Sequence, residues 1–260
     1  MFAKRALVYA AIATLLIATT GCSGKFRLVS DGKDAEITVA AASDLKIPLT
    51  RIARGFERTT GAKINLLFGS SGLMARQIEN GAPIDIYIPA SKKFVDQLAA
   101  KNMVGVSKAY ARSFVVLIGK ARTHGDLLLP EIKRIAIANP KHAPFGVAAV
   151  EILKNDGNWD KVKDKLVYAE NVASAFELVK TGNADAGFVA LSLAKPAKIG
   201  YTLINARYYK PIDVWMAAIK KTQRPHTVKA FMKYLEAPIP LDTLETGGLR
   251  PLTPDKDIAP

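Results

Sequence analysis

The strongest constraint on the fold of this chain is a regular alternation of two sequence patterns that begins at Glu36. Short apolar or alternating segments of strand length predict β-strands, whereas apolar residues three and four positions apart predict helices. Residues 172–179 and 228–235 show this helical spacing, and residues 113–118 form a long apolar strand candidate. Strands that alternate with helices of this length build parallel or mixed sheets with helices on both faces. The sequence therefore predicts an α/β fold.

Single residues set the boundaries of the first predicted elements. Pro48 fits only the first turn of a helix, so the first helix should begin near Ile47 and leave the residues after Ser43 as a turn with free N–H groups. Gly61 should end that helix. The predicted strands span residues 37–41, 64–68, 84–88, 113–118, 134–138, 186–189, 202–204 and 214–219, and further predicted helices span residues 73–79 and 92–100.

A targeting segment precedes this region. Lys4 and Arg5 stand before an apolar run over residues 6–18. Because that run is shorter than the roughly 20 residues needed to cross a bilayer, it predicts a cleaved export signal over residues 1–21 and not a permanent transmembrane helix. The protein is therefore expected outside the cytoplasm, in the periplasm or the cell envelope.

Cys22 follows this segment and is the only cysteine of the chain. It occupies the position at which bacterial lipoprotein signals place the residue that is lipidated after cleavage. The sequence therefore predicts a lipid anchor at Cys22 and a polar tether over residues 22–35. An ordinary secretory signal with an incidental cysteine is the alternative. A single cysteine forms no internal disulfide, which argues against a disulfide-stapled fold and against redox chemistry.

The chain is strongly basic, with a formal net charge of +14. Removal of residues 1–21 takes away Lys4 and Arg5 and leaves +12. Such a charge suits nucleic acid, an anionic membrane surface or an anionic ligand. Export argues against nucleic acid. The basic residues are scattered and often stand beside acids, so a solvated basic surface and electrostatic attraction of an anionic ligand are two open interpretations.

Four predicted helix starts follow small or hydroxylated residues, in segments 41–44, 69–72, 141–146 and 170–172. The first turn of a helix has unpaired N–H groups and carries the positive end of the helix dipole, so it binds oxyanions without Lys or Arg. Serine hydroxyls add further donors. Together the four segments predict a pocket that holds an anion with neutral groups.

The segments ITVAAASDL (residues 37–45) and FGSSGLMARQIENGAPIDI (residues 68–86) resemble the extracytoplasmic molybdate-binding proteins of ABC importers. The resemblance extends through residues 139–146, 168–172 and 186–190. It therefore covers nearly all of the mature chain.

The resemblance implies a two-lobed periplasmic-binding-protein fold of type II, with mixed sheets flanked by helices and the ligand in the cleft between the lobes. In such proteins the chain builds part of one lobe, crosses to build the second, and returns to finish the first. Applied to this sequence, lobe 1 comprises residues 36–114 plus 213–260, and lobe 2 comprises residues 115–212. The crossings are expected near residues 112–120 and 209–214.

The resemblance also implies the ligand contacts. Family residues that match Ser43 and Ser71 donate hydroxyl and backbone N–H hydrogen bonds to the bound tetrahedral oxyanion. Those that match Phe145 and Val172 contribute backbone N–H groups. Each serine also lies between a predicted strand and a predicted helix, where a helix cap explains it as well as a ligand contact does. The resemblance favours the ligand contact.

At Ala190 the chain departs from those relatives that have a tyrosine whose hydroxyl is a further donor. A water molecule or a nearby donor such as Ser192 is expected to replace it, so Ala190 and Ser192 are weaker candidates for ligand contact. Asp44 is the one acid beside a proposed donor. It is expected to point away from the ligand, because a fully deprotonated dianion is best bound by donors only.

Enzymatic interpretations find little support. His124, His142 and His226 are isolated, and no pair of them has the spacing of metal ligands. Segment 69–72 is not the Gly-x-Ser-x-Gly turn of hydrolases. A triad of Ser71, His142 and an aspartate, as in a secreted serine hydrolase, is the catalytic alternative. A helix cap and a surface imidazole explain these residues more simply.

The sequence thus predicts an exported solute-binding protein, monomeric and without cofactor or enzymatic activity, that binds molybdate or tungstate through Ser43, Ser71, Phe145 and Val172. Its expected partners are a membrane ABC permease with its ATPase, and the membrane itself through the lipid on Cys22. No nucleic acid is expected. Another oxyanion, such as sulfate or phosphate, is the alternative ligand.

Overall fold

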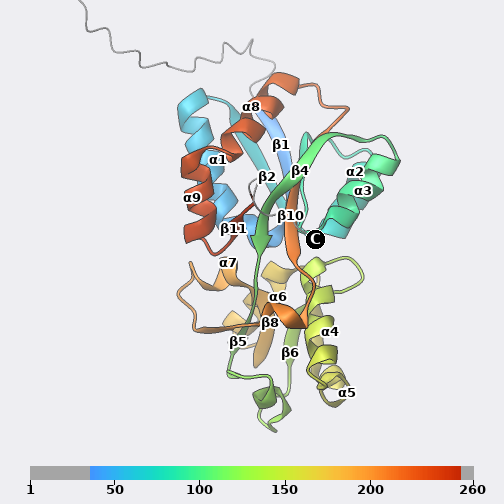
Figure 1. The fold of residues 1–260 in the computed structure, drawn as a ribbon, viewed down its shortest axis with the longest axis vertical. Coiled ribbons are helices and arrows are strands. Elements are labelled where there is room, and N and C mark those ends of the chain that lie inside the picture. Colours follow the sequence, from blue (N-terminus) through green and yellow to red (C-terminus); the bar gives the residue numbers. More distant parts are fainter. Residues whose placement is uncertain (1–35, 253–260) are drawn as a thin grey trace, which may run out of the picture.

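Two mixed β-sheets, each flanked by helices, form two lobes within residues 36–252, the part of the chain that the computed structural model describes (Figure 1). The predicted export signal, Cys22 and the tether lie outside these residues. The first sheet has the strand order β11 (Arg250–Pro251), β4 (Val104–Ser113), β10 (Ile212–Ile219), β3 (Ile86–Ile88), β1 (Glu36–Ala42) and β2 (Lys63–Gly69). The second has the order β7 (Leu166–Ala169), β6 (Ile135–Ala138), β8 (Ala186–Ala190), β5 (Val115–Gly119) and β9 (Tyr201–Leu203). The predicted α/β fold is confirmed.

Helices cover both faces of each sheet, as the alternating sequence pattern predicts. The helices that pack on the first sheet are α1 (Lys46–Thr60), α2 (Ser71–Glu79), α3 (Lys92–Ala100), α8 (Pro225–Leu235) and α9 (Pro238–Thr246). Those of the second lobe are α4 (Pro144–Asn155), α5 (Trp159–Val162), α6 (Val172–Lys180) and α7 (Leu191–Ala194). Short 3-10 turns are η1 (Ser43–Leu45), η2 (Gly125–Leu128), η3 (Lys163–Lys165) and η4 (Ala206–Tyr208).

Helix α1 shows how single residues set element boundaries. It begins at Lys46, so Pro48 lies in the first turn, where its missing N–H group has no intrahelical partner to lose. It ends at Thr60, and Gly61 caps it with the left-handed φ of 77° that glycine adopts at little steric cost. The expected turn after Ser43 is the 3-10 turn η1.

Strand β4 was not predicted from the sequence. Its segment VGVSKAYARS has polar residues and a glycine where a regular strand would alternate, and register shifts interrupt its pairing with β10. The predicted strand over residues 113–118 combines the last residue of β4 with most of β5. A single residue, Phe114, separates the two strands, so the chain passes from the first sheet directly into the second.

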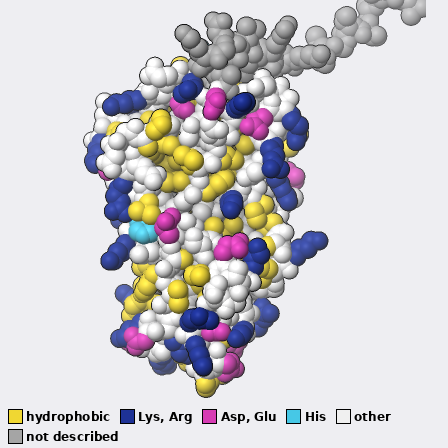
Figure 2. All heavy atoms as spheres, turned by 180° about the vertical axis from the view of Figure 1, so that it is seen from behind, with side chains coloured by type: hydrophobic (Ala, Val, Ile, Leu, Met, Phe, Trp, Pro, Cys, Tyr) yellow, Lys and Arg dark blue, Asp and Glu magenta, His cyan; other side chains and the backbone are white. Residues whose placement is uncertain are grey.

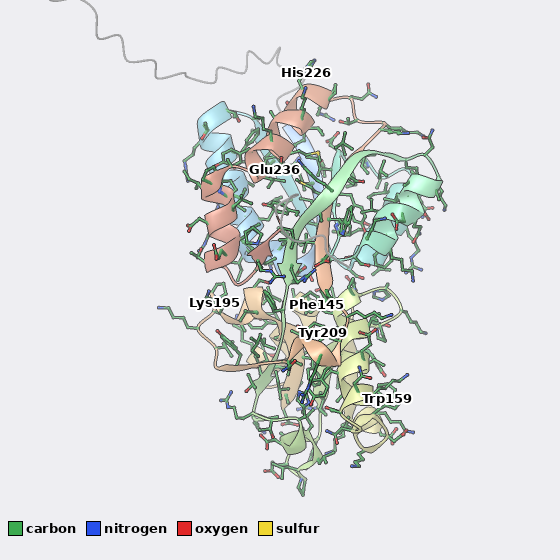
Figure 3. All side chains as sticks on the ribbon, in the orientation of Figure 1. Phe145, Trp159, Lys195, Tyr209, His226 and Glu236 are labelled. Atoms are coloured by element: carbon green, nitrogen blue, oxygen red, sulfur yellow. The ribbon has the colours of Figure 1, made fainter. Side chains whose placement is uncertain are left out.

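The chain returns to the first sheet close to the place where it left. Ile212, the first residue of β10, pairs with Ser113, the last residue of β4, so the two crossing segments run side by side. The Tyr209 hydroxyl accepts a hydrogen bond from the Val115 N–H group at 3.1 Å (Figure 3). Two adjacent crossing segments therefore connect the lobes.

An ion pair reinforces the crossing. The Arg112 guanidinium donates two hydrogen bonds to the Asp213 carboxylate, from Nε to Oδ1 at 2.6 Å and from a terminal nitrogen to Oδ2 at 3.0 Å. Such a bidentate pair fixes geometry as well as charge. It ties β4 to β10 at the point where β4 leaves the first sheet and β10 enters it.

Each lobe has its own apolar core. In the first lobe the rings of Phe56 and Phe231 meet edge to face with centroids 5.0 Å apart, which packs α8 on α1. In the second lobe Phe145, Phe176 and Phe188 are buried around β6 and β8. Because the cores are separate, the junction between the lobes is a natural place for a ligand, as domain interfaces commonly are.

The surface carries its positive charge in a dispersed form. On the face drawn in Figure 2, Lys and Arg side chains are spread over both lobes with acidic side chains among them. Within residues 36–252, no helix has the length and apolar character needed to cross a membrane.

Candidate binding site at the junction of the lobes

Two pairs of parallel strands bring the predicted contact residues together. In the first sheet β1 and β2 are parallel and Ala42 pairs with Gly69, so the segments that follow both strands start side by side. In the second sheet β6 and β7 are parallel, and Ala138 pairs with Ala169 at their ends. Helices α2, α4 and α6 begin in the segments that follow β2, β6 and β7. The predicted contacts therefore lie at the carboxyl-terminal edges of the strands, where open α/β sheets collect ligands.

A small cavity lies where these edges meet. Its wall includes all four residues predicted as ligand contacts, Ser43 and Ser71 from the first lobe and Phe145 and Val172 from the second. Figure 3 shows Phe145 at the junction of the lobes. The volume of the cavity is ≈ 10 Å³, whereas sites for drug-sized ligands measure about 300–1,000 Å³. The space left between the lobes at this point is therefore small.

The described wall of this cavity contains donors without cations. No Lys, Arg or His belongs to it, and Asp44 is its one ionisable side chain. Helices α2, α4 and α6 begin at the wall with Ser71, Pro144 and Val172. First-turn N–H groups have no partner inside their own helix, and the positive end of the helix dipole lies there. Such an arrangement binds an anion through neutral groups.

The Ser71 side chain is held in place by a neighbour outside its own helix. Its Oγ accepts a hydrogen bond from the Ala90 N–H group at 3.1 Å, and its backbone oxygen accepts one from the Tyr87 hydroxyl at 2.5 Å. The N-cap of α2 is Ser70, and no side chain caps the helix. Ser71 is therefore not a helix cap, and its hydroxyl proton is left for a further acceptor.

Ser43 is likewise no cap. Ala42 occupies the N-cap of η1, and no side chain caps that turn. The Ser43 Oγ instead accepts a hydrogen bond from the Ala173 N–H group of α6 at 3.3 Å, across the junction of the lobes. Because a hydroxyl oxygen that accepts can still donate, Ser43 retains its proton for a ligand.

Sequence reasoning missed the contact that Ser70 makes with the second lobe. The Ser70 Oγ lies 2.7 Å from Nδ1 of His142 and 2.7 Å from its backbone oxygen. The Gly72 N–H group donates to the same backbone oxygen at 2.9 Å. A Cβ atom at Gly72 would stand 2.9 Å from that oxygen, so only glycine permits this approach. Ser70 and Ser71 look alike in the sequence, and no sequence signal distinguishes which one meets the other lobe.

Asp44, whose side chain is expected to point away from the ligand, is one of the residues around the cavity. Its side chain is fully buried, and its Oδ2 accepts a hydrogen bond from the Ser113 hydroxyl at 2.5 Å. Among the described residues, Oδ1 has no hydrogen-bond partner. Burial raises the pKa of Asp44 to about 6, and the Ser113 hydroxyl and the backbone N–H group of Asp44 itself offset part of that rise.

The two weaker candidates do not line the cavity. Ala190 is fully buried at the end of β8, where it pairs with Val115. The Ser192 hydroxyl donates to the backbone oxygen of Asp44 at 2.7 Å. A hydroxyl has a single proton, and that of Ser192 is already used in this hydrogen bond. The bond holds the Asp44 backbone from the second lobe.

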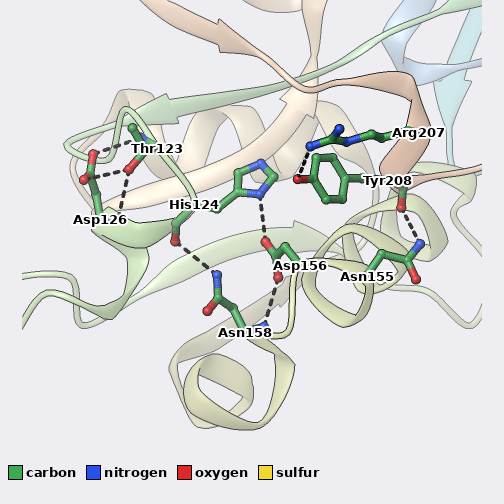
Figure 4. A network of polar contacts seen from close by, with 8 residues as sticks. All are labelled: Thr123, His124, Asp126, Asn155, Asp156, Asn158, Arg207 and Tyr208. Atoms are coloured by element: carbon green, nitrogen blue, oxygen red, sulfur yellow. Dashed lines mark hydrogen bonds and ion pairs between the residues drawn. The ribbon is translucent and has the colours of Figure 1, made fainter.

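The three histidines lie in three separate parts of the structure. His142 belongs to the contact with Ser70, and burial lowers its pKa, with a further lowering from the Arg76 charge. His226 lies in α8 of the first lobe (Figure 3). His124 lies in a polar network of the second lobe, with Nδ1 2.8 Å from Oδ2 of Asp156 and its backbone oxygen accepting from Asn158 (Figure 4). Residues 36–252 contain no group of three or more His, Cys, Asp or Glu side chains that could hold a metal ion.

A small donor-lined cavity between two α/β lobes, joined by two adjacent crossing segments, defines a two-lobed binding protein. Residues 37–250 match the family of bacterial extracellular solute-binding proteins, and the chain belongs to that family.

Individual relatives agree with this assignment. The molybdate-binding protein ModA of Azotobacter vinelandii is 33% identical over 226 residues, which cover 82% of this chain and 89% of the relative. The Bacillus subtilis protein named putative ABC transporter substrate-binding lipoprotein YvgL is 30% identical over 261 residues, covering 95% of this chain and 98% of the relative. The solved periplasmic molybdate-binding protein of Azotobacter vinelandii matches with a TM-score of 0.78 and 29% identity, covering 84% of this chain and 99% of that one. The two-lobed fold of type II predicted from the sequence is confirmed.

Proposed function

We propose that this protein captures molybdate or tungstate outside the cytoplasm and delivers it to a membrane ABC permease with its ATPase. The observation that carries the proposal is a small cavity whose wall combines serine hydroxyls and three helix N-termini and contains no cation. The names of the related proteins, molybdate-binding and ABC transporter substrate-binding, support this ligand and this partner.

The donor set favours a fully deprotonated dianion. Each ligand oxygen then meets an N–H or O–H group, which forms a charge-assisted hydrogen bond. We propose hydroxyl and N–H contacts from Ser43 and Ser71 and backbone N–H contacts from Phe145 and Val172. Selection of molybdate and tungstate over sulfate would rest on cavity size, since all three are tetrahedral dianions.

The ligand would also hold the two lobes together. We propose that residues 36–114 plus 213–260 act as one body and residues 115–212 as the other, with the crossing segments between them. The proposed contacts divide evenly between these bodies. The hydrogen bonds of Ser43 with Ala173 and of Ser70 with His142 span the same junction and support a closed form.

Three lysines support electrostatic attraction of the anion. Lys93, Lys141 and Lys210 line a groove beside the cavity together with one acid, Glu151, and the groove shares Ala90, Ala143 and Pro144 with the cavity wall. Positive charge at the entrance raises the association rate of an anion without contacting it in the bound state. The association rate of molybdate is therefore expected to fall as ionic strength rises, while the dissociation rate changes little.

Calorimetric titration of the purified mature protein with molybdate, tungstate, sulfate and phosphate tests the proposal. Molybdate and tungstate should bind with similar affinity, because they share charge and shape. Comparable binding of sulfate would contradict the specificity and leave an oxyanion site standing. The absence of binding by all four anions would contradict the proposed function itself.

A secreted serine hydrolase is the second candidate, and the contact between Ser70 and His142 is the one observation that favours it. The Ser70 hydroxyl is buried, and the His142 backbone oxygen competes for its proton. Within residues 36–252, no carboxylate is hydrogen-bonded to the His142 ring. We therefore propose that the protein is not an enzyme. Labelling of Ser70 by a fluorophosphonate probe, with loss of labelling in Ser70→Ala, would overturn this.

We further propose that the mature protein is a monomer held at the membrane by a lipid on Cys22, with no role for nucleic acid or a cofactor. Cys22 lies outside the described residues, and the lipoprotein name of the Bacillus subtilis relative supports the anchor. Mass spectrometry of the membrane fraction should show a diacylated or triacylated amino terminus at Cys22. A soluble mature protein with an unmodified thiol would contradict the anchor but not the export.

A further inference from the structure

The two serines proposed as ligand contacts are held by different lobes. The Ser71 hydroxyl oxygen accepts from the Ala90 N–H group at 3.1 Å, and both residues belong to the first lobe. The Ser43 hydroxyl oxygen accepts from the Ala173 N–H group at 3.3 Å, and Ala173 belongs to the second lobe. The first lobe alone therefore orients the Ser71 side chain, whereas the partner of the Ser43 side chain comes with the second lobe.

The turn that carries Ser43 also depends on the second lobe. In a regular helix the backbone oxygen of Asp44 would accept from the N–H group of residue 48, but that residue is Pro48, which has none. The Ser192 hydroxyl of α7 donates to this oxygen at 2.7 Å, and both residues are buried. Because a buried backbone oxygen needs a partner, the bond from Ser192 helps to hold η1 in its place.

Helix α7 reaches η1 from the second lobe. It follows β8 directly and lies at the junction of the lobes (Figure 1). The Leu191 N–H group donates to the Phe114 backbone oxygen at the crossing, at 2.9 Å. Leu191 also packs against Gly248 of the first lobe, where an added Cβ atom would stand 3.0 Å from the Leu191 Cγ. The helix that presents Ser192 is therefore fixed by further contacts on both sides of Ser43's turn.

We propose, on the basis of the oxyanion-binding function above, that Ser192 is a positioning residue whose bond to the Asp44 backbone sets η1, when the lobes close, so that the Ser43 hydroxyl reaches the anion. Ser192 itself does not line the cavity. Ser71, which the first lobe holds unaided, contacts the anion while the lobes are still open. Ser43 completes the site on closure.

This order of contacts separates the two serines kinetically. A contact made before closure stabilises the first complex, so its loss lowers the association rate and leaves the dissociation rate nearly unchanged. A contact made only on closure retains the ligand, so its loss raises the dissociation rate. The association rate should therefore fall about tenfold or more in Ser71→Ala, and the dissociation rate should rise about tenfold or more in Ser43→Ala.

Stopped-flow measurement of molybdate binding to the mature protein tests the role of Ser192. Ser192→Ala should raise the dissociation rate about tenfold and leave the association rate nearly unchanged. Ser192→Thr keeps the hydroxyl and should restore most of the wild-type rate. The matched control is Ser107→Ala, the same change at an exposed residue of β4. A dissociation rate in Ser192→Ala equal to that of the wild type would overturn the proposal.

A double-mutant cycle distinguishes positioning from a plain contact between the lobes. If Ser192 acts through Ser43, Ser192→Ala should have little effect on dissociation in a Ser43→Ala background. In a Ser71→Ala background it should have its full effect. An equal effect in both backgrounds would show that Ser192 only holds the lobes together, and the positioning role would be wrong.

Hydrogen exchange of the wild-type protein covers the case in which Ser192→Ala does not fold. The Ala90 amide should be equally protected with and without molybdate, because its bond to Ser71 lies within one lobe. The Ala173 amide lies in the first turn of α6 and should become more protected with molybdate, because its bond to Ser43 requires closure. Equal gains at both amides would contradict the order of contacts and leave the oxyanion site intact. If molybdate does not bind to the wild-type protein at all, the proposed function fails, and this inference fails with it.

Discussion

The Ser70 hydroxyl oxygen lies 2.7 Å from both Nδ1 and the backbone oxygen of His142, so one side chain of the first lobe meets two polar groups of one residue in the second. The hydroxyl has a single proton. If that proton goes to the backbone oxygen, Nδ1 must carry the hydrogen that it donates to Oγ. The lowered pKa of His142 favours a neutral ring, which can satisfy this pattern. The pair links the start of α2 to the segment before α4, directly beside the cavity.

Ser70→Ala should weaken molybdate binding without unfolding the protein. The change removes a contact that spans the two lobes, worth about 1–2 kcal/mol, which corresponds to roughly a five- to thirtyfold rise in Kd. The effect should appear in the dissociation rate, because the contact holds the closed form. Stopped-flow titration measures both rates. Ser107→Ala, a change at an exposed residue of β4, is the control, and an unchanged dissociation rate in Ser70→Ala would show that closure does not depend on this contact.

Ser43→Ala and Ser71→Ala should each reduce affinity by roughly 1.5–3 kcal/mol, the usual worth of a hydrogen bond to a charged group. Ser71→Ala should also lower the free energy of unfolding by about 1–3 kcal/mol, because the buried Ala90 N–H group loses its acceptor. Calorimetry gives the affinities, and urea unfolding gives the stability. A variant that lost stability and kept full affinity would mark its serine as structural only.

Local sequence signals determine much of the fold. Pro48 and Gly61 fix the two ends of α1, and apolar runs locate β1, β5 and β8. These signals work because they depend on residues a few positions apart. Strand β4 was not predicted because its pairing partner, β10, lies about a hundred positions further along the chain, and its own residues lack a regular period.

The residues of the site likewise fall into those that local motifs identify and those that depend on contacts between distant parts of the chain. The four residues predicted as contacts each belong to a local motif before a helix, and the structure brings them together around one cavity. The contact of Ser70 with His142 spans 72 positions, and that of Ser192 with Asp44 spans 148. Such contacts depend on how the lobes meet, which no local pattern encodes. The hydrogen bonds that bury Asp44 are of this kind, since they come from Ser113 of the first lobe and Ser192 of the second.

Gly146→Ala should destabilise the second lobe and, through it, the site. A Cβ atom at Gly146 would stand 2.1 Å from the Ala138 backbone oxygen and 2.7 Å from the Pro140 nitrogen, so the start of α4 must move away from β6. Overpacking of this kind costs typically about 1–3 kcal/mol, and backbone atoms cannot yield as a side chain does. Gly125→Ala is the control, because its added Cβ has no neighbour nearer than 3.6 Å. Equal melting temperatures for the two variants would contradict the close approach of α4 to β6.

Asp44→Asn should stabilise the ligand-free protein near neutral pH and change its stability little near pH 4. The pKa of Asp44 rises on folding from its ordinary value of 3.8 to about 6, so the folded state binds more protons than the unfolded state between these values. The free energy of unfolding therefore falls as pH rises through this window, and the full penalty of the buried charge is present above about pH 6. The pKa difference corresponds to about 3 kcal/mol, of which asparagine should recover about 1–3 kcal/mol, because its own amide group also needs partners. Urea unfolding of both proteins at pH 4, 5, 6 and 7.5 measures the difference, with Asp242→Asn, the same change at an exposed residue of α9, as the control. A difference that stays constant across this range would show that Asp44 does not titrate on folding, and one that grows as pH falls would mean that its carboxylate is stabilised by a partner.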